Sequence, residues 1–378
     1  MQQQSAIVIG AGIVGLACAR ALAEKGFSVT VFDRNVQASG ASVRNFGMIW
    51  PIGQPSGKLY NRAIRSREIW KEVAAATNMW CNQSGSLHLA YSAEEWQVLQ
   101  ELEIIFKNEN RGVELLDVTA IANQFEHIIQ TNLFGGLFSK EEMLIDPREA
   151  MQMLPIYLEK KYDVKFFWNT CVSKITNQTA CIEKEQTFYN ADIIFVCSGV
   201  DFETLYPTTF LQLPITKCKL QMMRTENVLE NLNIKTAVCG GLSLLHYNSF
   251  KAAPSLPILK NKMEAEMKPY LDLGIHVMAA QNDYGEITIG DSHQYGLHTD
   301  PFDKTYINKM VLDYLQTFLP VSENNIAETW HGFYSKLTNG DAEIFISPEK
   351  GVYILNGLGG AGMTLSFGLA EELINEIV

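Results

Sequence analysis

The strongest constraint on the fold of this chain is a glycine-rich turn between an apolar strand and a helix near its first residues. The apolar run Ala6-Ile7-Val8-Ile9 is followed by Gly10-Ala11-Gly12-Ile13-Val14-Gly15. In the pattern G-x-G-x-x-G, the first glycine makes the turn and the second lets a pyrophosphate approach the backbone. The third lets the helix pack on the strand, and the helix N-terminus faces the anion. The pattern predicts a dinucleotide site.

The residues after this turn complete a βαβ unit. Ile13–Lys25 is rich in Ala and Leu and is followed by Gly26, which predicts a helix with a glycine stop. Val29–Phe32 then predicts a second parallel strand. Asp33 follows it, 23 residues after Gly10, where a carboxylate accepts from ribose hydroxyls. With the adjacent Arg34 it is a candidate nucleotide contact, although this unit alone does not separate NAD from FAD.

A second glycine cluster near the end of the chain favours FAD. It follows a predicted strand over Val352–Leu355 and precedes a predicted helix over Leu365–Val378. The positive end of such a helix stabilises the negative charge that grows on the flavin N1–C2=O edge during reduction. A loop kept only for close packing is the alternative. The candidate flavin contacts in this cluster are Gly359, Gly360, Ala361, Gly362, Met363 and Thr364.

Nucleotide-type segments stand at the start, middle and end of the chain, with strand-rich segments between them. Helices are predicted over 66–76, 93–108, 147–161 and 303–319, and the region from Ile215 to Tyr295 is interpreted as longer, more polar strands. We therefore predict an α/β chain (α+β overall), in which a Rossmann-like FAD-binding domain is interleaved with a mixed or antiparallel-sheet substrate domain. The predicted division is 1–80, 141–214 and 326–378 for FAD, and 81–140 and 215–325 for substrate.

Composition narrows the function classes. The net charge of −12 argues against general nucleic-acid binding, which needs a basic footprint. The seven cysteines are dispersed, as in a reducing compartment. No signal peptide and no apolar run near the roughly 18 residues of a membrane span is evident, so we expect a cytoplasmic protein without integral membrane contact. No H-x-x-H or Cys/His spacing predicts a metal.

Four further motifs, together with the two glycine turns, carry a family resemblance. They are the loop Ala41–Met48, Ile145-Asp146-Pro147-Arg148, Thr170-Cys171-Val172, and Ala191-Asp192 leading to Cys197-Ser198-Gly199. Nearly the whole chain resembles the FAD-dependent amine and amino-acid oxidoreductases, which include glycine oxidase, sarcosine oxidase and D-amino-acid oxidase. The resemblance implies FAD contacts from Ser42, Val43, Arg44, Asn45, Phe46, Gly47, Met48, Val172, Ser198 and Gly199.

One stretch departs from that family. Amino-acid-oxidising members carry Trp-x-Gly-x-Arg, whose arginine pairs with the substrate carboxylate. This chain has tyrosine at that place, in Trp330-His331-Gly332-Phe333-Tyr334. A guanidinium clamps a carboxylate through two hydrogen bonds and a phenol offers one, so an ordinary α-amino acid is disfavoured.

The Ser42–Gln54 stretch resembles a subgroup tied to aminophosphonate breakdown. The implied substrates are N-methylated or hydroxylated relatives of 2-aminoethylphosphonate, whose tetrahedral dianion suits dispersed donors. Each candidate donor has a plainer interpretation as a salt bridge, packing group or half-buried strand end. The candidates are Arg44, His246, Tyr247, His331, Tyr334 and Lys336, with Lys219 ranked lower and Cys218 interpreted as core.

The predicted reaction removes a hydride from the carbon beside an amine nitrogen. The imine is hydrolysed to an aldehyde and an amine, and the electrons pass to oxygen or another acceptor. A D-amino acid, glycine or sarcosine substrate is the first alternative. The others are a flavin-binding module without turnover, an NAD-linked dehydrogenase and other flavin chemistry such as hydroxy-acid oxidation.

Overall fold

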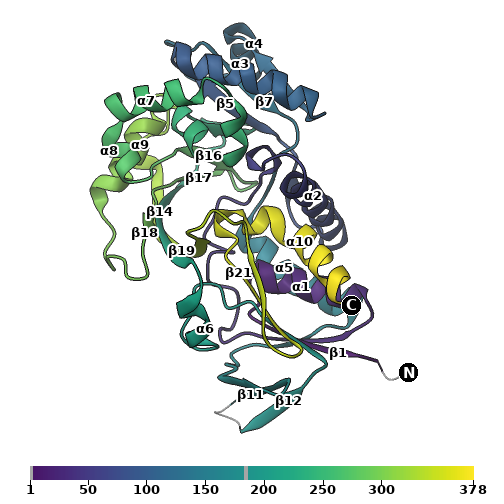
Figure 1. Ribbon diagram of the computed structural model, residues 1–378. Coiled ribbons are helices and arrows are strands. Elements are labelled where there is room, and N and C mark those ends of the chain that lie inside the picture. Colours follow the sequence, from purple (N-terminus) through teal and green to yellow (C-terminus); the bar gives the residue numbers. More distant parts are fainter. Residues whose placement is uncertain (1–2, 183–185) are drawn as a thin grey trace.

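A six-stranded sheet forms one half of the computed structural model, which describes residues 3–182 and 186–378 (Figure 1). Its order is β20-β21-β13-β1-β2-β9, and every neighbouring pair is parallel except β20 and β21. The predicted strands at both ends of the chain and in its middle therefore lie in one sheet. The strands are β1 (Ser5–Ile9), β2 (Ser28–Phe32), β9 (Lys165–Phe167), β13 (Ile193–Val196), β20 (Ile344–Glu349) and β21 (Val352–Asn356).

Helices from distant parts of the sequence pack against this sheet. In Figure 1 the yellow C-terminal helix α10 lies beside the purple N-terminal helix α1, and the two share one buried core. Trp70 is fully buried there and donates its indole N–H to the Met363 carbonyl at 2.9 Å. Burial of such a side chain stabilises the fold by about 2–3 kcal/mol. These helices are α1 (Ile13–Glu24), α2 (Lys58–Thr77), α5 (Pro147–Tyr162) and α10 (Gly362–Ile377).

A larger, mixed sheet forms the other half, with nine strands in the part of the chain that the structure describes. Its order is β18-β14-β17-β16-β15-β5-β7-β6, and β19 pairs with β14 outside that path. This agrees with the predicted mixed sheet. The strands are β5 (Ser86–Ala90), β6 (Val113–Leu116), β7 (Gly135–Ser139), β14 (Ile215–Asn227), β15 (Ala237–Cys239), β16 (Met278–Gln281), β17 (Glu286–Gly290), β18 (Gln294–Tyr295) and β19 (Ile326–Leu337).

The helices of this half include a correction to the sequence prediction. The region from Ile215 to Tyr295 is predicted as strands, but residues 256–266 and 268–272 are helical. Leu256, Leu259 and Met263 are buried at a helical spacing of three and four residues, which the strand interpretation overlooked. The helices are α3 (Ala93–Asn108), α4 (Val118–Gln124), α7 (Leu256–Glu266), α8 (Lys268–Asp272) and α9 (Thr305–Leu315).

Short elements complete the fold. β3 (Met48–Ile49) and β4 (Cys81–Asn82) pair with β8 (Met143–Ile145), and β10 (Lys174–Thr176), β11 (Thr179–Ile182) and β12 (Thr187–Asn190) form a separate antiparallel sheet. Single turns of helix are α6 (Pro207–Gln212), η1 (Pro51–Gly53), η2 (Gly241–Leu245), η3 (Asn248–Ala252), η4 (Glu323–Asn325) and η5 (Gly359–Ala361).

The sheets divide the chain slightly differently from the predicted boundaries. The prediction groups residues from 326 onward with the FAD-binding segments, whereas β19 runs along β14 from Ile326 to Leu337. A strand of this length binds its partner through many backbone hydrogen bonds, so β19 belongs to the larger sheet.

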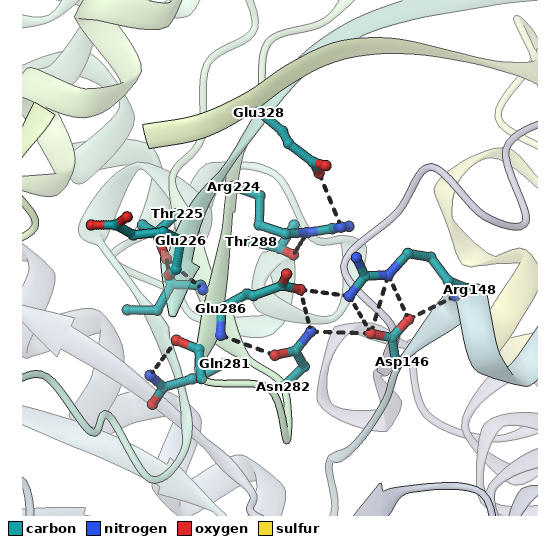
Figure 2. A network of polar contacts seen from close by, with 12 residues as sticks. Asp146, Arg148, Arg224, Thr225, Glu226, Gln281, Asn282, Glu286, Thr288 and Glu328 are labelled. Carbon is teal, nitrogen blue, oxygen red and sulfur yellow. Dashed lines mark hydrogen bonds and ion pairs between the residues drawn. The ribbon is translucent and has the colours of Figure 1, made fainter. Parts of the chain in front are cut away.

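A polar network joins the two halves (Figure 2). Asp146 caps α5 by accepting from the Arg148 backbone N–H at 2.8 Å, and the Arg148 guanidinium contacts Asp146 at 2.7 Å and Glu286 of β17 at 2.5 Å. Asn282 donates to both carboxylates. These contacts fix the start of α5 against the β16–β17 hairpin. Within the described residues, no helix has the length and apolar character needed to cross a membrane.

Candidate active site

A cavity of about 550 Å³ lies between the two halves and connects both glycine turns. Residues from the β1–α1 turn and from the η5–α10 turn line it together with side chains of β14 and β19. Cavities at the carboxyl ends of parallel strands are the usual ligand sites of such sheets. The cavity is therefore the candidate site.

Close backbone contacts explain the glycines of the first turn. Gly10 has φ +103°, and a Cβ there would lie 2.3 Å from the Cys197 carbonyl oxygen. A Cβ on Gly15 would lie 1.9 Å from the Gly10 carbonyl oxygen. Gly12 caps α1 without a side chain, so the helix begins with open backbone at the cavity. Asp33 accepts from the Ala11 N–H at 2.8 Å and lines the cavity at the end of β2.

The loop Ala41–Met48 is held in place by hydrogen bonds of its own and by contacts to distant elements. Asn45 donates to the Ala41 carbonyl at 2.9 Å and accepts from the Gly47 N–H at 2.8 Å. Ser42 accepts from the Ile13 N–H at 3.0 Å, which ties the loop to the start of α1. The loop therefore forms one wall of the cavity beside the first glycine turn.

The second glycine turn is positioned by buried polar contacts. Asn356 accepts from the Ser335 hydroxyl at 2.5 Å and donates to the Gly199 carbonyl at 2.9 Å. Gly359 has φ +61°, and α10 begins at Gly362 without a side-chain cap, three residues before its predicted start. The open N-terminus of this helix faces the same cavity as that of α1.

Most of the predicted site residues come together around the cavity. Those that line it are Gly10, Gly12, Ile13, Val14, Asp33, Arg34, Ser42, Arg44, Asn45, Phe46, Met48, Val172, Ser198, Gly199, His246, Tyr247, Tyr334, Lys336, Gly359, Gly360, Ala361, Gly362, Met363 and Thr364.

Four predicted residues lie outside the lining, and packing explains three of them. Gly15 packs α1 on β1, and a Cβ on Gly47 would lie 1.9 Å from the Ile145 carbonyl oxygen. Val43 packs against the helical core. These three residues therefore pack behind the residues that line the cavity.

The fourth residue, His331, faces away from the cavity. Its Nδ1 lies 3.0 Å from both oxygens of Asp303, which also pairs with Lys219 at 2.8 Å. His331 is opposite Gln221 in the β14–β19 ladder, and Gln221 contacts Asn308 of α9. Directly paired residues share one face of a sheet, so His331 and Lys219 lie on the α9 side. The structure thereby removes His331 from the set of predicted substrate donors.

Sequence reasoning overlooked a polar cluster at the end of the cavity. His246, His276 and His293 each present a nitrogen within 4.8 Å of the others, and all three line the cavity with Asp291. The rings of His246 and His276 stack at 3.7 Å with a 4° angle. His276 Nδ1 lies 3.2 Å from Asp291 Oδ1. The sequence offered one signal for this cluster, because Asp291 and His293 directly follow β17.

Burial sets the charge of this cluster. It lowers the pKa of His293 to about 4 and holds the pKa of His246 and His276 well below the ordinary value. Burial also raises the pKa of Asp291 far above the ordinary value. These shifts favour the uncharged form of the imidazoles and the protonated form of Asp291. Burial likewise raises the pKa of Tyr334, so its phenol remains a hydrogen-bond donor.

The family described as "FAD dependent oxidoreductase" matches residues 5–376. This chain belongs to that family. It is 22% identical over 355 residues to one of the subunits of opine oxidase from Rhizobium meliloti, in an alignment that covers 90% of this chain and 84% of the relative.

Two further proteins, one curated relative and one solved structure, are also similar to this chain. Over 250 residues the chain is 23% identical to the tRNA 5-methylaminomethyl-2-thiouridine biosynthesis bifunctional protein MnmC from Nitrosospira multiformis, covering 62% of this chain and 39% of that protein. It therefore spans well under half of that relative. The glycine oxidase from Geobacillus kaustophilus has the same fold, with a TM-score of 0.77 at 17% identity, over 100% of this chain and 94% of the other.

The residues of this FAD-dependent oxidoreductase fit its cofactor. Gly12 lines the cavity and a Cβ there would meet only the Ser42 hydroxyl at 3.2 Å, so the backbone of the first turn is accessible where the diphosphate approaches. At the second turn, a Cβ on Gly359 or Gly360 would meet Tyr334 at 3.9 Å, so this part of the cavity is bounded by the phenol ring. FAD, when bound, supplies the two-electron oxidation.

The protein's own groups supply positioning and electrostatics. Two helix N-termini direct partial positive charge into the cavity, and Tyr334 and Lys336 of β19 stand beneath the second turn. Trp50 donates its backbone N–H to the Thr364 hydroxyl at 3.0 Å, which fixes the wall next to α10. The arrangement can hold an anionic small molecule beside the ring end of the cofactor.

Proposed function

We propose that this FAD-dependent oxidoreductase oxidises the carbon beside the amine nitrogen of an aminophosphonate. N-methylated and hydroxylated forms of 2-aminoethylphosphonate are the substrates proposed. The carbon loses a hydride to the cofactor and the nitrogen loses a proton. Water then hydrolyses the imine to an aldehyde and an amine, while oxygen or another acceptor takes the electrons.

The presence of Tyr334 beneath the second glycine turn is the observation that carries this proposal. A carboxylate substrate needs a fork of donors such as a guanidinium, and the side chain here is a protonated phenol. Arg34 is engaged with Asp201 at 2.8 Å, and Arg44 donates to the His331 carbonyl at 3.2 Å. Dispersed single donors suit a tetrahedral group with three oxygens better than a planar carboxylate.

The relatives support an amine as substrate, and they also define the competing possibility. The glycine oxidase and the opine oxidase are named for oxidation of an amino acid and of an opine. A D-amino acid, glycine or sarcosine is therefore the second candidate class for this chain.

Anaerobic mixing of the purified holoenzyme with each candidate tests the proposal. The oxidised flavin band should bleach fastest with an N-methylated or hydroxylated 2-aminoethylphosphonate, and the aldehyde should form in equal amount. Faster bleaching by glycine, sarcosine or a D-amino acid would assign the enzyme to amino acids instead. A protein that binds FAD and is reduced by none of these amines would fit a flavin-binding module.

A further inference from the structure

The histidine cluster, defined as His246, His276 and His293, lies one side chain away from the ring end of the cofactor site. Tyr334 packs against the glycine turn of η5, and its ring centroid lies 6.2 Å from that of His293. The three histidines come from the end of η2, the strand entry before β16 and the segment after β17. A substrate that extends past Tyr334 would therefore meet this cluster.

We propose that the histidine cluster and Lys336 form the subsite that binds the phosphonate group of the substrate. The inference rests on the proposed function for the identity of the anion. It assigns the recognition of that anion to residues other than an arginine.

Hydrogen bonding inside the cluster leaves nitrogens available to a ligand. His293 Nδ1 lies 2.9 Å from the Gly274 carbonyl oxygen and donates to it, so Nε2 remains for the cavity. His276 Nδ1 lies 3.2 Å from Asp291 Oδ1, but neither atom has a hydrogen-bond partner among the described residues, so no hydrogen bond engages Nδ1 of His276. His246 has no hydrogen bond from its ring to any described residue and is open to the cavity.

Lys336 gives the subsite its charge. Its Nζ lies 5.0 Å from the centroid of the Tyr295 ring, and that ring stacks on the His293 ring with centroids 6.1 Å apart. Its Nζ lies 3.2 Å from the Tyr295 hydroxyl, and no ion pair in the described part of the chain includes it. A cation beside neutral hydrogen-bond donors attracts an anion, because the Coulomb attraction adds to the hydrogen bonds that the donors make.

The same features disfavour a divalent cation in the cluster. The Lys336 ammonium would repel a metal ion, and parallel rings stacked at 3.7 Å direct their nitrogens side by side rather than toward one point. A planar carboxylate would use only two of the donors, whereas a tetrahedral anion presents three oxygens to donors from several sides. A phosphonate dianion therefore matches the subsite best.

Titration of the holoenzyme with methylphosphonate tests the inference without turnover. Methylphosphonate should perturb the flavin absorption spectrum and compete with the aminophosphonate substrate, and acetate at equal ionic strength should bind at least tenfold more weakly. His276→Asn, His293→Asn and Lys336→Met should each raise the Kd of methylphosphonate about tenfold, the effect of one lost charge-assisted hydrogen bond. His127→Asn, at a partly exposed histidine away from the cavity, should leave that Kd unchanged.

Variants at buried histidines need a check of folding, so FAD content and the unfolding temperature are measured for each. His246→Gln and Lys336→Met alter side chains that face the cavity, and they keep the test valid if a buried variant fails to fold. Methylphosphonate binding that stays within twofold of the parent in both variants would overturn the inference. Cobalt(II) absorption bands that require the three histidines would overturn it in favour of a metal site.

Failure of the inference is separable from failure of the proposed function. If an aminophosphonate bleaches the flavin while its KM is unchanged in the cluster variants, the reaction stands and this subsite is wrong. If methylphosphonate binds through the cluster and no aminophosphonate is oxidised, the subsite stands and the proposed reaction is wrong.

Discussion

The cofactor end and the substrate end of the cavity are built in different ways. The cofactor end uses contiguous segments, such as the turn after β1 and the turn before α10, and a glycine there allows a close backbone approach, as between Gly15 and the Gly10 carbonyl oxygen. The substrate end gathers single side chains from η2, β16, β17 and β19. The cofactor end, built from contiguous segments, depends on backbone shape. The substrate end, built from single side chains, depends on charge and on the geometry of the hydrogen-bond donors. Mutations should therefore have different signatures at the two ends.

Gly15→Ala should have the largest effect, because the added methyl group would lie 1.9 Å from the Gly10 carbonyl oxygen. Relief of this overlap must separate α1 from β1 at a cost of about 3 kcal/mol. The variant should lose FAD, measured by visible absorption of the purified protein, and unfold at a lower temperature. Gly40→Ala is the matched control, since its Cβ would meet nothing within 4 Å. A yellow, stable Gly15→Ala protein would contradict the backbone explanation.

The pH dependence of stability should belong to the substrate end. Burial lowers the pKa of His293 from 6.5 to about 4, so between these values the unfolded chain binds a proton that the folded protein does not. The free energy of unfolding therefore falls as pH decreases through this window, by up to about 3 kcal/mol from this residue, and levels off below it. His293→Asn should flatten the denaturation curves measured from pH 7 to pH 4. An unchanged slope would show that His293 is already protonated when folded.

Tyr334→Phe should have a smaller, purely functional effect. Loss of one phenol hydrogen bond to the substrate lowers kcat/KM about tenfold and leaves FAD content unchanged. Rapid-mixing reduction of the flavin measures this, with Tyr306→Phe at an exposed position of α9 as the control. Equal rates in the two variants would mean that Tyr334 only packs beneath the glycine turn.

Arg148→Met should have the smallest effect, since it breaks the polar network of Figure 2 without touching the cavity. The guanidinium is 35% exposed, so solvent screens its pairs and the expected loss is about 1 kcal/mol in the free energy of unfolding. Thermal unfolding measures it against Lys309→Met, whose pair with Asp313 is more exposed. A loss of FAD in Arg148→Met would show that the network also shapes the cofactor end.

Much of the fold followed from local patterns. The helix predicted over 93–108 has the bounds of α3, because Ser92 and Glu95 form a reciprocal cap that fixes its start. The strand prediction for the region containing α7 and α8 was wrong, since neither short helix has a side-chain cap to mark its start and the helical spacing of Leu256, Leu259 and Met263 was overlooked. The pairing of β19 with β14 could not be predicted from local sequence either, because the paired residues lie more than 100 positions apart.

The sequence by itself determined the cofactor end. A strand, a glycine turn and a helix are contiguous there, so the motif can be identified from local sequence, although the contact that requires Gly10 comes from the distant Cys197 carbonyl. The tertiary structure decided which polar side chains face the cavity. It turned His331 toward Asp303 and brought His276 and His293 beside His246, since the face of a strand and the meeting of distant segments depend on sheet register and burial.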